Sequence, residues 1–358
     1  MRKSLVVSLA LSVLSLVPLV SHAHLSNPVP EKGHARSPIH MNTLARISLG
    51  GLEQWILTQG KDELNPVLLF LHGGPGIPII PFVSDFDAQA KLQEHFVMVY
   101  WDQRGAGKSY HADIPVESMN IEQFLTDTYE LIEILRKRFQ VPKIYLVGHS
   151  WGSIIGALTA ARHPELFYAY VGIGQVVNLK ENEQISYRFA RQQAIQTDNQ
   201  RALQQLTAIG PPPYRSYKDM LVERAWVERF GGGKRAQRYS DSSFGTDERA
   251  VLSLALPFLD TLDWLQGPSF SLKNLWDELQ TVNLFQQVPL LEVPVYFLEG
   301  RHDYYTPSII AQRYYDVLDA PQGKTLIWFE ESAHLPPSEE PEKFYNILVN
   351  RILKETHH

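Results

Sequence analysis

Short apolar runs alternate along the chain with longer segments in which apolar residues recur at helical spacing. The runs have the length and composition of buried strands and lie at 67–71, 97–101, 143–147, 168–173, 295–300 and 324–329. Helical spacing follows at 121–139, with Asn120 as N-cap, and at 151–162, 308–315 and 341–353. Two further runs, 46–49 and 52–58, flank Gly50-Gly51 and predict an opening β-hairpin. This pattern is typical of an α/β fold with a mostly parallel sheet covered by helices on both faces.

The alternation stops after Gln175 and resumes near residue 295. Between 178 and 289 the pattern predicts amphipathic helices and loops but no strands. An insertion of this length can fold as a unit of its own. We therefore expect a core built from 24–177 and 290–358, with a helical cap at 178–289.

The first 23 residues have the pattern of a secretory signal peptide. Arg2 and Lys3 precede an apolar stretch at 5–20, and the small residues Ser21 and Ala23 flank a histidine. The alternative is an uncleaved membrane anchor, although the apolar stretch is shorter than the roughly 20 residues that a spanning helix needs. We expect cleavage after residue 23 and export to the periplasm or the medium.

Composition narrows the classes of chemistry. The chain has 358 residues, of which 44% are hydrophobic and 20% charged, and its net charge of −6 argues against nucleic acid as a partner. It has no cysteine, which excludes disulfides, thiolate metal sites and a cysteine nucleophile. The histidines show no metal-binding spacing, so we expect no metal.

The sequence GHSWG at 148–152 fits the G-x-S-x-G nucleophile elbow. A predicted strand ends just before it and a predicted helix begins just after it, which is the context that the motif requires. The helix start also places a backbone N–H and a positive dipole end beside the serine oxygen. These features predict Ser150 as a nucleophile.

An acid and a histidine follow later in the chain, in the order that this fold uses. Asp303 lies just after the strand at 295–300, and His334 lies just after the strand at 324–329. Both loops are expected at the sheet edge that carries the elbow, so we predict a relay from Ser150 through His334 to Asp303. His302 and His149 are the rival histidines; His149 is expected to be packed or to line the pocket.

An oxyanion hole needs two backbone N–H groups. One is expected from Trp151, which follows the nucleophile, and the other from the glycine-rich loop HGGPG at 72–76. A third glycine-rich stretch, GAGKS at 105–109, resembles the end of a phosphate-binding loop. That loop requires glycine where this chain has Asp102, so we predict a tight turn in which Asp102 and Arg104 make structural hydrogen bonds.

Three stretches together resemble the prolyl aminopeptidase (proline iminopeptidase) group of α/β hydrolases: HGGPG at 72–76, WDQRGAGKS at 101–109 and GHSWGS at 148–153. The resemblance implies the α/β-hydrolase fold and a Ser150, Asp303 and His334 triad. It also implies Gly74 and Trp151 as oxyanion donors, release of an N-terminal residue, typically proline, from peptides, and no metal or organic cofactor.

The cap departs from this group. Its members typically carry W-x-x-W-E and A-R-I-E-x-H-Y-F segments whose glutamates bind the substrate's amino group. Residues 224–228 are the nearest analogue of the first segment, and the second has no counterpart. Glu228 is the favoured amine anchor, followed by Glu183 and Glu223, and the alternative for each is an exposed helix acid. An exported carboxylesterase, lactonase or amidase acting on a small ester or amide is the alternative function, and a catalytically silent binding protein is the third.

Overall fold

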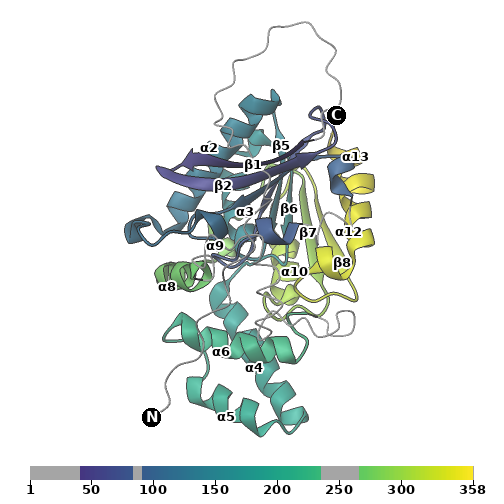
Figure 1. Cartoon of the computed structure of the whole chain (residues 1–358). Coiled ribbons are helices and arrows are strands. Elements are labelled where there is room, and N and C mark those ends of the chain that lie inside the picture. Colours follow the sequence, from purple (N-terminus) through teal and green to yellow (C-terminus); the bar gives the residue numbers. More distant parts are fainter. Residues whose placement is uncertain (1–40, 84–90, 235–265, 358) are drawn as a thin grey trace, which may run out of the picture. The chain divides into compact units, whose positions relative to one another are not determined.

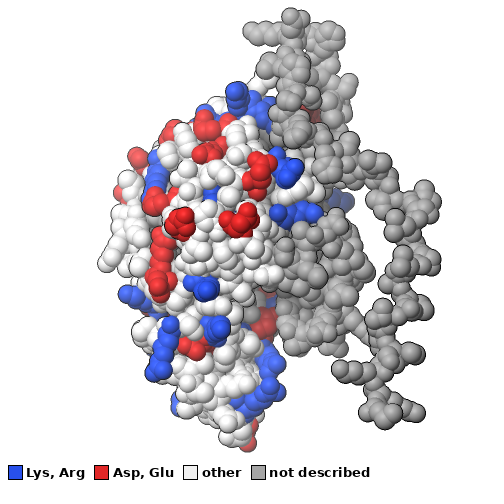
Figure 2. Space-filling model, turned by 60° about the vertical axis from the view of Figure 1, so that its left-hand side comes forward, with Lys and Arg blue, Asp and Glu red and all other residues white. Residues whose placement is uncertain are grey.

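A computed structural model describes residues 41–83, 91–234 and 266–357. The predicted signal peptide at 1–23 lies outside the described residues, as does 235–265 within the predicted cap. Within the described ranges, no helix has both the length and the apolar character that crossing a bilayer demands. Acidic and basic side chains are interspersed on the face that Figure 2 shows.

An eight-stranded sheet forms the centre of the fold, in the order β1-β2-β4-β3-β5-β6-β7-β8 (Figure 1). The strands after the opening hairpin pair in parallel, which confirms the predicted sheet type. Their bounds are Val67–Leu71 for β3, Val97–Asp102 for β4, Ile144–His149 for β5, Phe167–Ile173 for β6, Val295–Gly300 for β7 and Lys324–Phe329 for β8.

The predicted hairpin is confirmed and is longer than the sequence pattern indicates. β1 (Met41–Leu49) and β2 (Leu52–Gly60) pair antiparallel, with Leu49 opposite Leu52 across the two-residue turn. β2 also pairs antiparallel with β4, which attaches the hairpin to the parallel strands.

Helices cover both faces of the sheet. On one face lie α2 (Ile121–Phe139), α3 (Trp151–Arg162) and α10 (Ser308–Val317), whose buried residues share a core with Leu69 and Val99. On the other face lie α12 (Pro341–Ile347) and the helical turns that continue it, Leu348–Ile352 and α13 (Leu353–Thr356). The Asn120 side chain accepts a hydrogen bond from Gln123 N and caps α2 as predicted.

Between β6 and β7 the chain forms α4 (Leu179–Gln196), α5 (Gln200–Ile209), α6 (Tyr217–Arg229), α8 (Gly267–Leu279) and α9 (Leu284–Gln287). Figure 1 shows α4, α5 and α6 grouped together. They enclose a core of their own that includes Tyr187, Leu206 and Trp226. Leu275 of α8 and Leu284 of α9 instead join the core of the sheet.

The loop after β4 is held by two buried acids. Arg104 Nε donates to Asp127 Oδ2 of α2 at 2.9 Å, and both side chains are fully buried. Asp102 accepts from the amides of Ile79 (2.9 Å), Ile80 (3.1 Å) and Lys108 (3.2 Å). The structural role predicted for Asp102 and Arg104 is therefore confirmed.

Candidate active site

Ser150 lies in the turn that joins β5 to α3. Its φ of 54° and ψ of −121° are a backbone conformation that residues with a side chain rarely adopt. Two hydrogen bonds hold the turn: Ser150 N donates to Ile173 O at 3.0 Å, and Ser153 Oγ donates to Ser150 O at 2.6 Å. The neighbouring structure thus maintains a strained conformation at the candidate nucleophile.

Close packing explains the two glycines of the elbow. A Cβ on Gly148 would lie 2.4 Å from Gly152 O, and a Cβ on Gly152 would lie 2.2 Å from Leu71 O. No side chain fits at either position without moving the backbone. The turn therefore packs directly against the end of β3, where the HGGPG loop begins.

Asp303 and His334 meet as the sequence predicts. His334 Nδ1 donates to Asp303 Oδ2 at 2.7 Å, and the two residues are 7% and 3% exposed. Because Nδ1 carries the proton, the other ring nitrogen, Nε2, is the one able to accept one. Within the part of the chain that the structure describes, Nε2 makes no hydrogen bond.

Three further donors fix the Asp303 carboxylate. The amides of Tyr305 and Thr306 donate to Oδ1 at 2.8 and 2.9 Å, and Thr306 Oγ1 donates to Oδ2 at 2.8 Å. With His334, four hydrogen bonds compensate for the burial of the charge. The sequence analysis did not identify Thr306, whose position three residues after the acid is the only signal for its role.

His334 lies next to the turn that holds Ser150. A Cβ on Gly174 would be 3.0 Å from His334 Nδ1, and Gly174 directly follows Ile173, whose carbonyl accepts from Ser150 N. The ring of His149, the residue before Ser150, is centred 4.7 Å from the His334 ring. The hydroxyl of Ser150 makes no hydrogen bond to any described residue.

His149 supports the backbone of His334. Its Nε2 donates to His334 O at 2.9 Å. Burial, reinforced by the neighbouring His334, lowers the pKa of His149 to about 3, so the ring is neutral at ordinary pH. The packed role expected for His149 agrees with this contact.

The HGGPG loop passes beside Ser150. A Cβ on Gly73 would lie 3.1 Å from the Ser150 Cβ. Gly74 has a φ of 124°, and a Cβ there would be 2.8 Å from the amide nitrogens of Gly76 and Ile77, so glycine is required. Trp151, the second predicted oxyanion residue, is buried at the start of α3.

Two of the three glutamates predicted as amine anchors share one arginine. Arg224 of α6 donates to Glu183 Oε1 of α4 at 2.6 Å and also to Glu223 Oε2. Both glutamates are buried, and each has one carboxylate oxygen, Glu183 Oε2 and Glu223 Oε1, that accepts no hydrogen bond from any residue that the structure describes. Burial raises the pKa of both carboxyls, although the Arg224 charge opposes the shift. Sequence analysis did not identify Arg224 as their shared partner.

Glu228 makes no ion pair with Arg224 among the described residues, but both side chains approach Tyr305: the Arg224 guanidinium lies 5.7 Å from the centre of that ring. Glu228 is half-buried and its carboxylate lies beside the side chain of Tyr305, whose ring is centred 5.3 Å from the His334 ring. Burial raises the pKa of Glu228. Tyr305 therefore connects both groups of acids to the neighbourhood of His334.

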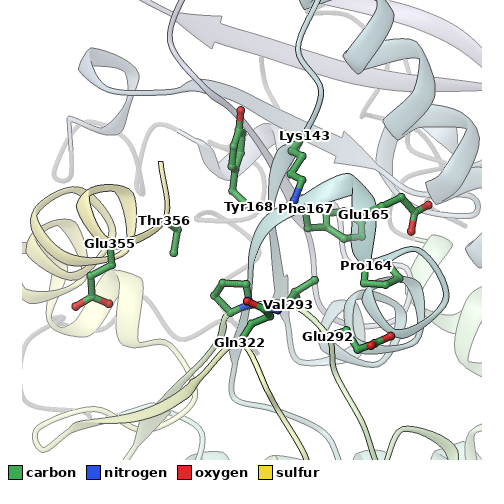
Figure 3. A pocket seen from close by; sticks show the side chains of 11 residues that line it. Lys143, Pro164, Glu165, Phe167, Tyr168, Glu292, Val293, Gln322, Glu355 and Thr356 are labelled. Atoms are coloured by element: carbon green, nitrogen blue, oxygen red, sulfur yellow. The ribbon is translucent and has the colours of Figure 1, made fainter. Parts of the chain in front are cut away.

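A separate cavity of about 580 Å³ lies at the amino ends of the parallel strands, opposite the ends that carry Ser150 and Asp303 (Figure 3). Lys143, Phe167 and Pro294 line it, and these residues precede or begin β5, β6 and β7. Ser150 lies at the carboxyl end of β5, so this cavity is distinct from the candidate site. Across residues 41–83, 91–234 and 266–357, no group of three or more His, Asp or Glu side chains is arranged to hold a metal.

Comparison with known proteins agrees with this geometry. The family model described as alpha/beta hydrolase fold matches residues 66–341. "Probable aminopeptidase YbaC" of Bacillus subtilis is 38% identical over 314 residues, covering 85% of this chain and 94% of the relative. A proline iminopeptidase of Clostridioides difficile is 29% identical and covers 82% of this chain and 90% of its own length.

Solved structures show the same fold. The proline iminopeptidase of Mycobacterium smegmatis matches with a TM-score of 0.61 over 88% of this chain and 99% of its own, at 17% identity. That identity supports a shared fold only. The matched family model, the relative in Bacillus subtilis and the sheet with its elbow together establish that this chain belongs to the α/β-hydrolase family and is a hydrolase.

Proposed function

We propose that this hydrolase is a serine aminopeptidase that releases the N-terminal residue, proline or a similar one, from small peptides. The observation that carries the proposal is the Asp303–His334 hydrogen bond of 2.7 Å beside the strained turn of Ser150. The relatives named as an aminopeptidase and a proline iminopeptidase support the substrate class.

In the proposed reaction, Ser150 Oγ attacks the carbonyl carbon of the scissile bond while its proton passes to His334 Nε2. The amides of Gly74 and Trp151 stabilise the negative charge that develops on the carbonyl oxygen. Collapse breaks the C–N bond, and the proton moves from His334 to the leaving amine. Water then hydrolyses the acyl-enzyme with the same nitrogen as base, which frees the amino acid and restores the serine.

We further propose that cap carboxylates bind the substrate's ammonium group. Glu228 is favoured by its position near Tyr305 and His334. Glu183 and Glu223 are supported by their two buried carboxylate oxygens that have no hydrogen-bond partner among the described residues. A bound ammonium supplies the missing donors, and its positive charge favours the ionised form of these carboxyls.

A substrate panel tests the proposal. The purified protein is assayed on Pro- and Ala-aminocoumarin, on their N-acetyl forms and on p-nitrophenyl butyrate, with Ser150→Ala as the inactive control. Preference for the free amines supports an aminopeptidase, and turnover of the ester alone supports the carboxylesterase, lactonase or amidase alternative. No turnover together with no fluorophosphonate labelling would favour a binding protein instead.

The amine anchor is tested by charge-neutral substitutions. Glu228→Gln, Glu183→Gln and Glu223→Gln are compared on a free-amine substrate and on its N-acetyl form. The anchoring residue is the one whose replacement raises KM for the free amine far more than for the acetylated substrate, because only the ammonium needs the charge. Equal losses on both substrates would remove that residue from the role.

We also propose that residues 1–23 are cleaved and that the mature chain is exported to the periplasm or the medium. The basic start, the apolar stretch and the small residues before position 24 support this. Intact-mass measurement of the protein recovered from each cell fraction tests it. A full-length chain retained with the membrane would instead support the anchor.

A further inference from the structure

Gln103 is a buried residue, 1% exposed, in the loop directly after β4. Its main chain and side chain form hydrogen bonds with two residues, His72 and Trp151. The main-chain N–H donates to His72 Nε2 at 3.0 Å, and the side-chain Nε2 donates to His72 O at 3.2 Å. The side-chain Oε1 accepts from Trp151 Nε1 at 3.0 Å.

The first contact controls the HGGPG loop. Because Gln103 N–H donates to His72 Nε2, the proton of the neutral ring is on Nδ1, which donates to Gly73 O at 2.7 Å. Burial lowers the pKa of His72 to about 4 and keeps the ring neutral. The C=O of Gly73 and the N–H of Gly74 belong to one planar trans peptide and point in opposite directions. Holding the carbonyl therefore aims the Gly74 N–H.

The second contact controls the start of α3. The Trp151 indole is fixed at its nitrogen by Gln103 and packs edge-on against Phe124, with ring centroids 5.2 Å apart. The main-chain N–H of Trp151 is the other proposed oxyanion donor. The side chain of Gln103 thus bonds to both segments that form the proposed oxyanion hole. One contact is to His72, 31 positions away in sequence, and the other is to Trp151, 48 positions away.

We propose that Gln103 is a positioning residue that sets the spacing of the two oxyanion amides, Gly74 and Trp151. This inference rests on the proposed serine-hydrolase function. Donors must lie about 2.7–3.1 Å from the oxyanion to stabilise it. A small relative movement of the two amides therefore weakens binding of the transition state more than binding of the substrate.

Three substitutions separate the contacts. Gln103→Leu removes both side-chain bonds, Gln103→Glu keeps an acceptor for the indole and loses the donor to His72 O, and Trp151→Phe keeps a buried ring and the main-chain amide. Each leaves the Gln103 main-chain N–H in place. If Gln103→Leu does not fold, Trp151→Phe breaks the same bond from the other side.

The assay measures kcat and KM for the substrate of the panel that the wild type turns over best, and the inhibition constant of a trifluoromethyl ketone, which forms a tetrahedral oxyanion on the serine. We expect Gln103→Leu to lower kcat by about 10- to 100-fold, less than removal of a donor, with KM changed by less than about threefold. The ketone should bind more weakly by a factor similar to the loss in kcat/KM.

Gln54→Leu is the matched control. Gln54 is also buried and accepts from a tryptophan, Trp101 Nε1, at 3.0 Å, but it contacts neither the HGGPG loop nor Trp151. We expect it to lower the melting temperature while kcat and ketone affinity stay near those of the wild type. A similar loss of kcat in both leucine variants would mean that general destabilisation is responsible and would overturn the inference.

The outcomes also separate this inference from the proposed function. An active wild type with unchanged kcat and ketone affinity in all three variants would overturn the role of Gln103 alone. A wild type that hydrolyses neither the aminocoumarin substrates nor the ester, and that does not bind the ketone, would overturn the serine-hydrolase function and this inference with it.

Discussion

Replacing Asp303 with asparagine tests the proposed relay at the hydrogen bond that carries it. The amides of Tyr305 and Thr306 both donate to Oδ1, so the asparagine oxygen is expected to stay there and its NH2 to occupy the position of Oδ2. In the wild type, Oδ2 accepts a hydrogen bond from His334 Nδ1 at 2.7 Å. In the variant, the NH2 at that position would instead donate to Nδ1. The imidazole proton would move to Nε2, and the ring could no longer take the proton of Ser150.

The wrong tautomer in a comparable relay lowers kcat by about 10⁴-fold, which corresponds to about 5 kcal/mol of transition-state stabilisation. We expect a loss of that order for Asp303→Asn, measured as kcat on p-nitrophenyl butyrate. The melting temperature should change little, because the two main-chain bonds remain. Asp316→Asn, on the exposed side of α10, is the matched control and should retain full activity. A folded Asp303→Asn variant with more than a tenth of wild-type kcat would refute the relay.

Three further predictions concern stability. Asp127→Ala should lower the free energy of unfolding in urea by about 3–5 kcal/mol, because it leaves the buried charge of Arg104 without its ion-pair partner; a loss below about 1 kcal/mol would contradict this. Burial lowers the pKa of His72 to about 4, so the unfolded chain binds a proton there first as the pH falls below 6.5. This group alone should therefore lower the free energy of unfolding by roughly 3 kcal/mol as the pH falls from 6.5 to 4. His72→Asn should remove this part of the pH dependence of stability. Burial raises the pKa of Glu223, so its contribution to stability is lost as the pH rises above 4.5, and Glu223→Gln should reduce that slope.

The sequence predicted the central elements well where a buried apolar run ends at a clear turn. The predicted strands 67–71, 295–300 and 324–329 and the helix 151–162 have the same bounds in the structure. β1 begins at Met41, five residues before the predicted start at 46. The hydrophobic pattern missed these residues because Asn42 and Thr43 are polar. Pairing stabilises that end of the strand: Gln59 Nε2 donates to Asn42 Oδ1 at 3.1 Å.

The sequence predicted those residues of the candidate site whose positions follow from their order in the chain and from the ends of strands. Asp303 and His334 each follow a strand in the order that the fold uses, and they are in contact. Gln103 and Arg224 were not predictable as partners of the site, because their contacts join residues 31 to 48 positions apart through the tertiary structure. Arg224 also adjoins Glu223 in sequence, which resembles an ordinary charged helix surface.

The buried carboxylate of Asp102 has a consequence for the GAGKS turn. Main-chain N–H groups of such a turn can form a nest that binds a phosphate. Here the amide of Lys108 already donates to Asp102 Oδ2, and a Cβ on Gly107 would be 2.2 Å from that same oxygen. The protein's own carboxylate therefore occupies the place that a nucleotide phosphate would need. The GAGKS turn instead stabilises the loop after β4, on the side of the sheet that carries the candidate active site.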